Sequence, residues 1–403
     1  MTDSVFLQRV VLKNYRSIAA CDISLGRLVF LVGPNGAGKS NFLDALEFVA
    51  DSLRASLDHA LRDRSGINEV RRRSRGHPTH FGIRLDFRLR DGSEGRYGFR
   101  IGAKSHGAYE VQQEECVVRT DPLGPDVYFR VRSGEVESSI SIVPPASSDR
   151  LYLVNAAGLP DFRPVYDSLS QMGFYNLNPD RIRDLQSPDP GELLTRDGRN
   201  LASVLSQIST RAPKAKARIE EYLAQVVPGV TGVDSRVVGP METLEFRQVV
   251  AGSPDPWRFL AASMSDGTLR ALGILVALFQ PGKPNGARVP LIGIEEPETA
   301  LHPAAAGVLR DSLNDASEST QVLVTSHSPD LLDDDDIDVE AIRAVVAEVG
   351  TTHIAKIDEA GRTAIRDRLY TPGELLRLNQ LAPDRHDVDR SVNAQLGLFG
   401  ERD

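Results

Sequence analysis

The feature that most constrains this chain is a glycine-rich loop placed between a strand and a helix. The continuous apolar run at 28–32 is typical of a strand buried on both faces. It leads directly into GPNGAGKS at 33–40, and an amphipathic helix pattern follows. This context is the one in which a G-x-x-x-x-G-K-S loop surrounds phosphates with backbone N–H groups. A chance glycine-rich turn is the competing interpretation, and the flanking strand and helix disfavour it.

The loop at 33–40, called the phosphate loop below, predicts a nucleoside triphosphate with Mg²⁺ as its ligand. The Lys39 ammonium would lie against the outer phosphates, and the Ser40 hydroxyl would bind Mg²⁺. The positive end of the following helix would face the same phosphates. The residues expected to contact the nucleotide are Asn35, Gly36, Gly38, Lys39, Ser40 and Asn41.

A second apolar run, at 289–294, ends in two carboxylates, Glu295 and Glu296. A carboxylate at such a strand end commonly reaches the metal, directly or through water, and a second one can orient or deprotonate the attacking water. We therefore expect Glu295 to bind Mg²⁺ and Glu296 to act on the water. Two solvated acids at a strand end are the alternative interpretation.

Two further segments favour the functional interpretation. His327 follows the apolar strand pattern at 321–326, and we expect it to contact the γ-phosphate. A lone histidine is usually structural, but the order of loop, carboxylates and histidine favours a phosphate contact. Ser265 and Gly267 open a helix pattern and would form a second anion site at its start, whereas without a ligand Ser265 would be an ordinary N-cap.

The order of these segments resembles the ABC-type ATPases of the SMC, RecF and OLD branch, and is most similar to small predicted bacterial ATPases related to RecF and OLD. The resemblance is carried by LKNYRSI at 12–18 with the phosphate loop, by 265–275, by IGIEEPETALHP at 292–303, by QVLVTSHSP at 321–329 and by DGRNL at 197–201. Many such ATPases have aspartate where this chain has Glu295. The glutamine that usually links nucleotide and partner lobe is missing from 75–90, where His77 or His80 would stand in.

The resemblance implies a mechanism. Two heads form a homodimer that sandwiches two ATP molecules, so Ser265 and Gly267 would contact the ATP held by the phosphate loop of the other chain. His327 would sense the γ-phosphate, Glu296 would drive hydrolysis, and the segment at 297–300 would cross the dimer interface. ATP then joins the two chains, and its hydrolysis releases them.

Pattern and resemblance together predict an α/β fold. We expect an ABC/SMC-type ATPase head with a mixed sheet carrying the phosphate loop, an antiparallel β-meander and a helical insertion lobe. The expected parts are the N-terminal part of the head at 1–149, the mainly helical lobe at 150–230, the C-terminal part of the head at 231–380 and a flexible tail at 381–403.

Composition excludes several classes of protein. The longest apolar run has about nine residues, and a membrane span needs ~20. The N-terminus lacks a secretory pattern, and two cysteines make no disulfide framework, so we expect a cytoplasmic protein. About 70 residues follow Pro329, so we expect no C-terminal nuclease and treat the acidic run at 333–338 as a solvated loop. A separately encoded effector is expected by analogy.

Two short segments predict partners. Six arginines lie between residues 62 and 75 against two acids in a chain of net charge −9, and Arg71, Arg72 and Arg73 would bind DNA. Pairing with surface acids is the alternative. The C-terminal QLGLF at 395–399 resembles the peptide by which bacterial proteins bind the replication sliding clamp. The contacts would come from Gln395, Leu396, Leu398 and Phe399, unless the leucines and Phe399 fold back onto the body.

The sequence therefore predicts an ATP-hydrolysing RecF/OLD-like switch that dimerises with ATP in DNA repair or anti-phage defence. The alternatives are the ATPase subunit of a membrane transporter and a scaffold that holds ATP without hydrolysing it. The S-D-G-T segment and the NYRSI element favour the RecF/OLD branch over the transporter. Lys39, Glu296 and His327 speak against the scaffold.

Overall fold

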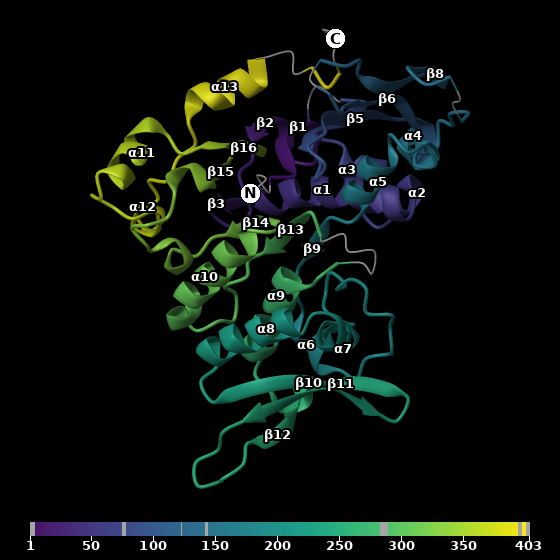
Figure 1. Cartoon of the computed structure of the whole chain (residues 1–403). Helices are drawn as coiled ribbons and strands as arrows, with labels where there is room; N and C mark the ends of the chain where they lie inside the picture. The colour runs from purple at the N-terminus through teal and green to yellow at the C-terminus, as the bar shows by residue number, and fades with distance from the viewer. Residues whose placement is uncertain are drawn as a thin grey trace. The chain divides into compact units, whose positions relative to one another are not determined.

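The computed structural model contains two compact units (Figure 1). Unit 1 comprises Met1–Met172 and Asp335–Asp403, and unit 2 comprises Gly173–Asp334. The boundary between the units at residue 172 falls within the stretch expected to form the helical lobe. The described residues are 5–74, 78–121, 123–141, 144–282, 289–393 and 397–399.

Unit 1 is built on a mixed sheet with the strand order β8-β7-β6-β5-β4-β1-β2-β16-β15-β3. The pairs β3–β15 and β2–β16 are parallel, and the others are antiparallel. The run β4 to β8 is the predicted meander. The strands are β1 (Leu7–Tyr15), β2 (Ile18–Ser24), β3 (Leu28–Val32), β4 (His80–Arg88), β5 (Glu94–Ala103), β6 (Tyr109–Arg119), β7 (Val127–Arg132), β8 (Glu135–Ser138), β15 (Ile342–Glu348) and β16 (Thr351–Lys356).

The helices of unit 1 include α1, which follows the phosphate loop. Its side chain Phe48 packs edge-on against Phe81 of β4 and lies near Tyr15 of β1, so the helix is fixed to the sheet by aromatic contacts. The helices are α1 (Lys39–Arg54), α2 (Leu57–Arg62), α3 (Ile67–Val70), α4 (Tyr152–Ala156), α5 (Arg163–Ser170), α11 (Glu359–Arg366), α12 (Pro372–Arg377) and α13 (Arg385–Asn393). Single 3-10 turns are η1 (Ser105–Gly107) and η5 (Val339–Ala341).

Unit 2 combines a short parallel sheet, a group of helices and a separate antiparallel sheet. The parallel strands have the order β14-β13-β9, and the antiparallel strands have the order β10-β11-β12. Of the predicted lobe at 150–230, residues 150–172 lie in unit 1, and in unit 2 the strand β9 precedes the helices, which end at residue 226 before a three-stranded sheet. The strands are β9 (Gly173–Tyr175), β10 (Val230–Val238), β11 (Met241–Gln248), β12 (Trp257–Leu260), β13 (Leu291–Glu295) and β14 (Gln321–Ser326).

The helices of unit 2 pack on the parallel strands and on one another. The most apolar of them is α9, whose side chains from Thr268 to Leu278 are all buried. The helices are α6 (Pro179–Arg183), α7 (Leu201–Arg211), α8 (Pro213–Val226), α9 (Asp266–Phe279) and α10 (Ala306–Ser317), with 3-10 turns η2 (Ala261–Ser263), η3 (Pro303–Ala305) and η4 (Asp330–Leu332).

The C-terminal region, expected to be a flexible tail, contains ordered structure. Helix α13, drawn in yellow in Figure 1, packs on β2 and β16. Leu398 and Phe399 are only 1% and 3% exposed and pack with Val11 and Ala20. Their burial follows the second interpretation of the tail, in which these side chains fold back onto the body. Gln395 and Leu396 lie outside the described residues.

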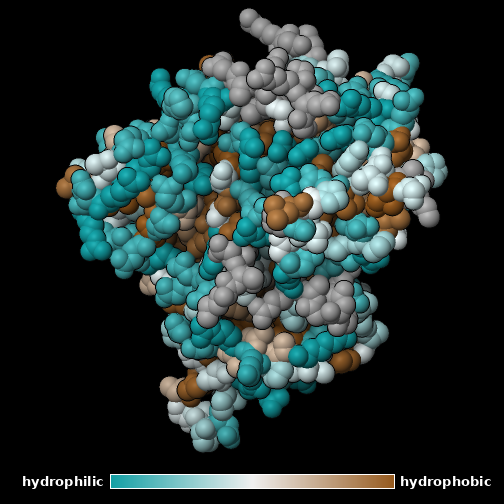
Figure 2. Space-filling view, turned by 45° about the horizontal axis from the view of Figure 1, so that its top comes forward, coloured by the Kyte–Doolittle hydropathy of each residue, from teal (hydrophilic) through white to brown (hydrophobic). Residues whose placement is uncertain are grey.

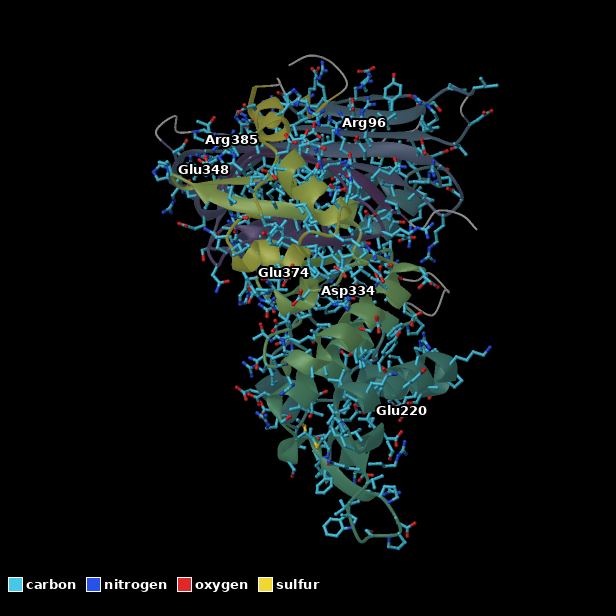
Figure 3. All side chains as sticks on the ribbon, turned by 90° about the vertical axis from the view of Figure 1, so that its left-hand side faces the viewer. Arg96, Glu220, Asp334, Glu348, Glu374 and Arg385 are labelled. Carbon is cyan, nitrogen blue, oxygen red and sulfur yellow. The ribbon has the colours of Figure 1, made fainter. Side chains whose placement is uncertain are left out.

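The surface is dominated by polar side chains. Figure 2 shows a mostly hydrophilic face with hydrophobic side chains in small groups. Figure 3 shows charged side chains projecting from both units, among them Glu220 of α8 and Glu374, which completes the capping box of α12. Among the described helices, none is long and apolar enough to cross a membrane.

Candidate functional site

The phosphate loop in unit 1 has the backbone that phosphate binding needs. It joins β3 to α1, and Asn35, Gly36 and Ser40 are exposed. Gly38 has a φ of 98°, and a Cβ on it would lie 2.1 Å from the Thr352 hydroxyl, so only glycine fits there. Gly36 has a φ of 77°, and no atom of the described residues lies within 4 Å of its Cβ position, so within this part of the chain there is open space beside the loop. This arrangement fits a bound triphosphate.

Lys39 lies folded over the phosphate loop. The residue is 4% exposed, and its Nζ donates to the carbonyl oxygens of Gly33 at 2.8 Å and Pro34 at 3.1 Å. A phosphate oxygen makes a stronger, charge-assisted hydrogen bond to an ammonium than a neutral carbonyl does. Lys39 is therefore held where an arriving phosphate can take over its hydrogen bonds.

A hydroxyl network supports the loop from strands distant in sequence. The Thr352 hydroxyl donates to the Ala37 carbonyl at 2.8 Å and lies 2.6 Å from the Ser17 hydroxyl. Asn41, which we expected at the nucleotide, donates its side-chain amide to Ser17 Oγ at 2.6 Å. Neither Ser17 nor Thr352 was among the expected site residues. Thr352 carries no motif, and no sequence signal could have identified it.

In unit 2 the structure brings Glu296 and His327 together. Glu295 ends β13, and the Glu296 N–H donates to the Thr325 carbonyl at 3.0 Å on the neighbouring strand β14. His327 Nδ1 lies 3.2 Å from Glu296 Oε1. Glu296 has a φ of 44°, which is costly for a residue other than glycine and is typical of functional positions. These two residues, which were expected in separate roles on water and on the γ-phosphate, are therefore in contact.

Two charged side chains near this pair were missed by sequence reasoning. Arg196 Nη2 lies 2.8 Å from Glu295 Oε1, so the expected metal carboxylate is held by an arginine. Glu298 Oε1 accepts from the Ser326 hydroxyl at 2.6 Å and from the His327 N–H at 3.3 Å. The segments 197–201 and 292–303 had been noted, but spacing alone does not show these pairings.

Ser265 caps helix α9. Its hydroxyl accepts from the Thr268 N–H at 3.2 Å, which is the N-cap role considered as the alternative. Ser265 and Asp266 are exposed, so this helix end is accessible to a second molecule. A Cβ on Gly267 would lie 2.6 Å from the Ala300 carbonyl oxygen, so glycine here permits close contact between α9 and the segment after Glu296.

The segment nearest to Glu295 on the β9 side carries asparagines. The strand β9 is the parallel neighbour of β13, and Asn176 and Asn178 follow its carboxyl end. The Asn176 N–H donates to the Arg196 carbonyl, and Asn178 caps α6.

His80, considered as a replacement for the missing glutamine, begins β4 in unit 1, and His77 lies outside the described residues.

The candidate magnesium ligands lie one in each unit, Ser40 in unit 1 and Glu295 in unit 2. The described residues contain no group of three or more His, Cys, Asp or Glu that could hold a metal ion by themselves. Mg²⁺ usually takes one or two protein oxygens and completes its shell with phosphates and water. Ser40 is exposed and the Glu295 side chain is 17% exposed, so each offers an accessible oxygen.

The acidic run at 333–338 serves the local fold. Asp334 pairs with Arg310 in unit 2. In unit 1, Asp336 lies 3.5 Å from Arg368, and Asp338 caps η5. The aspartates thus have separate partners, as expected for a loop and not for a metal site.

Most of the basic cluster is engaged within unit 1. Arg71 donates to the Pro78 carbonyl at 2.8 Å, and Arg72 donates to the Ser17 carbonyl at 3.0 Å and to the Thr351 hydroxyl at 2.8 Å. Arg73 pairs with Glu69, yet its side chain remains 69% exposed. Arg72 therefore supports the phosphate-loop region, and Arg73 is the member of the trio most available to a partner.

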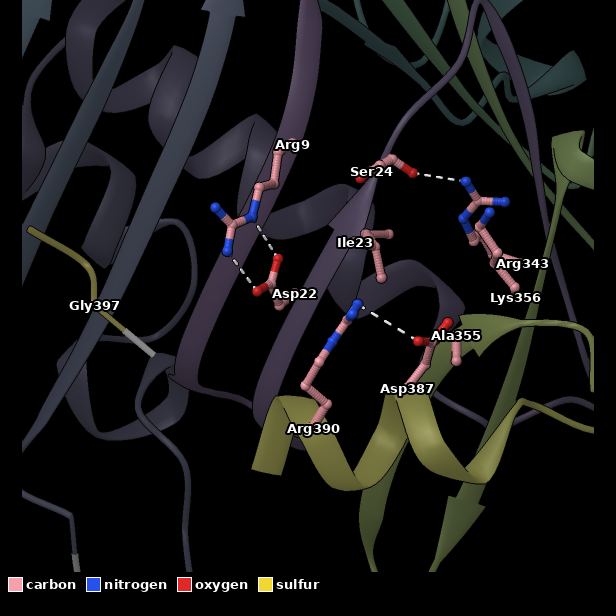
Figure 4. Close-up of a pocket in the computed structure, with 10 residues that line it drawn as sticks. All are labelled: Arg9, Asp22, Ile23, Ser24, Arg343, Ala355, Lys356, Asp387, Arg390 and Gly397. Carbon is pink, nitrogen blue, oxygen red and sulfur yellow. Dashed lines mark hydrogen bonds and ion pairs between the residues drawn. The ribbon is translucent and has the colours of Figure 1, made fainter. Parts of the chain in front are cut away.

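A polar cavity of about 470 Å³ lies in unit 1 (Figure 4). Arg9 and Asp22 form a bidentate pair there, and Arg390 lies 3.4 Å from Asp387. Arg343 donates to the Ser24 carbonyl at 2.7 Å. None of its lining residues belongs to the phosphate loop. Because these charges are satisfied by internal partners, the cavity is a weaker candidate for a ligand site than the phosphate loop.

Comparisons with known proteins agree with this geometry. The family model described as "AAA domain, putative AbiEii toxin, Type IV TA system" matches residues 28–333. An OLD nuclease of Thermus scotoductus (strain ATCC 700910 / SA-01) is 24% identical over 386 residues, which cover 91% of this chain and 68% of that protein.

Two solved structures of SMC heads show the same fold. One is the SmcHead bound to the C-winged helix domain of ScpA, with a TM-score of 0.55, 17% identity and coverage of 88% of this chain and 99% of that one. The other is an Smc head domain with an extended coiled coil bound to the C-terminal domain of ScpA, from Pyrococcus furiosus. Its TM-score is 0.55, with 12% identity and coverage of 90% and 99%. At these identities the likeness concerns the fold alone.

Proposed function

The chain belongs to the AAA-domain family described as putative AbiEii toxins and is a P-loop ATPase of the RecF/OLD-like, SMC/ABC type, and on that premise we propose that it hydrolyses ATP as a dimerisation switch. The contact of 3.2 Å between His327 and Glu296 carries the proposal. In this contact His327 lies against Glu296, whose carboxylate would act on water. Glu296 directly follows β13, and the last residue of that strand, Glu295, would bind the metal. A scaffold that only holds ATP has no need of that pair.

Each half of the proposed site has a distinct task. Lys39 would bind the outer phosphates, the loop N–H groups would surround them, and Ser40 and Glu295 would hold Mg²⁺. Bound Mg²⁺ supplies positive charge that offsets the phosphates. Glu296 orients the water and accepts its proton, while His327 fixes the Glu296 carboxylate and contacts the γ-phosphate. Arg196 has to release Glu295 when the metal binds, since both need the same carboxylate.

The proposed dimerisation would use the exposed N-terminus of α9. Ser265 and Gly267 lie at a helix end that carries partial positive charge, and the hydroxyl is accessible. The phosphate loop of a second chain would present ATP to this end. The test is the Glu296→Gln variant with ATP and Mg²⁺, which should accumulate as a dimer without releasing phosphate.

The proposed setting is DNA repair or anti-phage defence, with DNA or a separately encoded effector as partner. The relative in Thermus scotoductus is by its name a nuclease, which favours a nucleic-acid partner over a membrane transporter. We place the DNA contact at Arg73 and Arg62, whose side chains are 69% and 77% exposed. Arg71 and Arg72 hold backbone carbonyls and contribute less to such a surface.

An Arg73→Ala variant should show a weaker salt dependence of DNA binding. Each phosphate contact contributes roughly 0.9 to the slope of log affinity against log salt, so losing one should lower the slope by about 1. Binding to duplex DNA would be titrated from low to physiological salt. Arg119→Ala is the control, because Arg119 is also exposed and paired with an acid, Asp126. If the Arg73 variant and the control keep the wild-type slope, this surface does not bind DNA.

The proposed sliding-clamp contact requires release of the C-terminal segment. Leu398 lies in a notch between two glycines of β4 and β5, since a Cβ on Gly82 would lie 2.3 Å from a Leu398 methyl. Arg84 donates to the Gly397 carbonyl at 3.0 Å, and the Arg100 guanidinium lies 5.6 Å from the Phe399 ring centre. A clamp and this notch therefore compete for the same two side chains.

A synthetic peptide of residues 392–403 should bind the purified clamp more tightly than the full chain does. Gly82→Val should raise the affinity of the full chain towards that of the peptide, because valine fills the notch. Fluorescence anisotropy with labelled clamp would measure both. Gly158→Val is the control, because Gly158 is exposed, has no positive φ, and its Cβ would meet only the Asn155 carbonyl oxygen at 3.9 Å among the described residues. A peptide that fails to bind at roughly tens of micromolar removes the clamp from the list of partners.

A further inference from the structure

We propose that Arg270 is a positioning residue that joins the start of helix α9 to the hydrolytic end of β13 within unit 2. The inference rests on the proposed function, because it concerns how Glu295 and Glu296 are held for hydrolysis. Arg270 lies five residues after Ser265 on the helix whose N-terminus would meet the ATP of a second chain. It is thus part of the element that senses the partner, while its guanidinium contacts the element that acts on water.

The guanidinium binds three backbone carbonyls on two separate segments. Nη2 is shared between the carbonyl oxygens of Glu295 at 3.2 Å and Glu296 at 3.1 Å. Nη1 donates to the Leu177 carbonyl at 2.8 Å, in the segment that follows β9. The planar fork of arginine can make these bonds in one fixed geometry, which lysine cannot do. Arg270 therefore sets the spacing between the β9 loop, the carboxylate pair and α9.

Burial of the Arg270 guanidinium has a desolvation cost in free energy that packing alone does not offset. Arg270 is 8% exposed, and its Nε has no hydrogen-bond partner among the described residues. Burial lowers the pKa of the guanidinium, and the carboxylates of Glu298, Glu296 and Glu295 oppose this by favouring the charged form. Removing a buried cation while its partners remain usually destabilises a protein, so a loss of stability in an Arg270 variant does not by itself distinguish a positioning role from a structural one.

The backbone that Arg270 holds is strained. Glu296 has a φ of 44° and Ala300 a φ of 66°, so the segment carrying the catalytic carboxylate turns sharply twice within five residues. Such a conformation persists only where its surroundings enforce it. The carbonyl contacts of Arg270 enforce it at Glu296, and the close approach of Gly267 to the Ala300 carbonyl enforces it at the second turn. Both contacts come from the first two turns of α9.

A displacement of the start of α9 would therefore move Glu296. When a second chain brings ATP to Ser265, the start of α9 shifts or becomes more rigid. Arg270 transmits this change through its hydrogen bonds to the Glu295 and Glu296 carbonyls. The carboxylate then reaches its working position only in the dimer. In a single chain Arg270 already contacts both carbonyls, and the ATP of a second chain would fix the start of the helix that carries it.

The test is steady-state ATP hydrolysis by the full-length Arg270→Ala variant. Turnover should fall about 100-fold, as expected for a small misplacement of a catalytic group, while the apparent affinity for ATP changes by less than about threefold. Guanidinium chloride at millimolar concentration should restore part of the turnover by filling the vacated space. A purely structural role would change stability and affinity together and would show no such rescue.

Two further variants keep the outcome decisive. Arg270→Lys should fold, since it keeps a cation in place, and should still lose turnover because an ammonium cannot hold the three carbonyls. Arg310→Ala is the matched control, a largely buried arginine of unit 2 that binds the Leu331 carbonyl and Asp334. It should lose stability and keep its turnover.

The failure of this inference is distinguishable from that of the proposed function. If the wild-type chain releases no phosphate, the proposed function is wrong. If the wild type hydrolyses ATP and Arg270→Lys does so equally well, the proposed function stands and the positioning role of Arg270 is wrong. The same holds if Arg270→Ala loses affinity for ATP as much as turnover and is not rescued by guanidinium.

Discussion

The Glu296→Gln variant should bind ATP, accumulate as a dimer and release phosphate at least about 100-fold more slowly than the wild type. General base catalysis contributes roughly 10²–10⁴-fold, and glutamine keeps the shape of the side chain but cannot accept the proton. His327 Nδ1, now 3.2 Å from Glu296 Oε1, can still hydrogen-bond to the amide. ATP therefore stays intact between the two chains, and the dimer persists.

Mass measurement in solution, with and without ATP and Mg²⁺, would follow the dimer while phosphate release is recorded in parallel. Glu348→Gln is a matched control, because Glu348 is an exposed glutamate at the end of β15 (Figure 3) and has no role in the site. It should behave as the wild type. If the mass of the wild type and of Glu296→Gln does not change with ATP, and neither protein releases phosphate, the proposed dimerisation switch is wrong. ATP is then at most a structural ligand.

Sequence was sufficient where function depends on short segments. The phosphate loop, its strand and its helix are contiguous, so their pattern shows directly in residues 28–54. Glu296 and His327 lie in contact because each follows its own buried strand, and parallel neighbours bring their carboxyl ends to one edge. The RecF/OLD-like family, the α/β head and the meander were predicted on the same grounds and are confirmed.

Sequence was insufficient where contacts join distant residues. The Thr352 hydroxyl reaches Ala37 across more than 300 residues, and no periodicity reports such a pair. Arg196 and Arg270 look like ordinary helix or loop arginines until the fold shows their carboxylate and carbonyl partners. The burial of Leu398 depends on Gly82, whose missing side chain leaves the notch. The sequence left this burial open as one of two interpretations of the C-terminal segment, and it did not show where on the body the side chains would pack.

Replacing Glu114 should make the stability of the chain less dependent on pH. Glu114 of β6 is fully buried, and this burial raises its pKa from 4.5 to about 7, although the N–H groups of Tyr152 and Leu153 and the Tyr97 hydroxyl oppose the shift by donating to it. A carboxyl whose pKa is higher folded than unfolded favours the folded state while protonated. Its contribution is complete below pH 4.5 and is lost as the pH rises through 7.

The loss should amount to about 3 kcal/mol between these limits, since one pKa unit corresponds to about 1.4 kcal/mol. Glu114→Gln cannot ionise, so its free energy of unfolding should be flatter than that of the wild type from pH 5 to 8. Urea unfolding followed by circular dichroism would measure this free energy. Trp257 fluorescence is not suitable, because Trp257 lies in unit 2 whereas Glu114 lies in unit 1.

The neighbouring residue, Glu115, provides a control whose pKa shifts in the opposite direction. Burial alone would raise the pKa of Glu115, but hydrogen bonds from Arg130 and from Arg96, which is labelled in Figure 3, outweigh burial and lower it. The stabilisation by Glu115 is present at neutral pH and is lost in acid. The free energy of unfolding of Glu115→Gln should therefore fall furthest below that of the wild type at neutral pH and approach the wild-type value as the pH falls. Two adjacent glutamates on one strand thus give opposite pH slopes because they face different partners. If Glu114→Gln and the wild type give parallel curves from pH 5 to 8, Glu114 is ionised in the folded chain, and its three hydrogen-bond donors outweigh its burial.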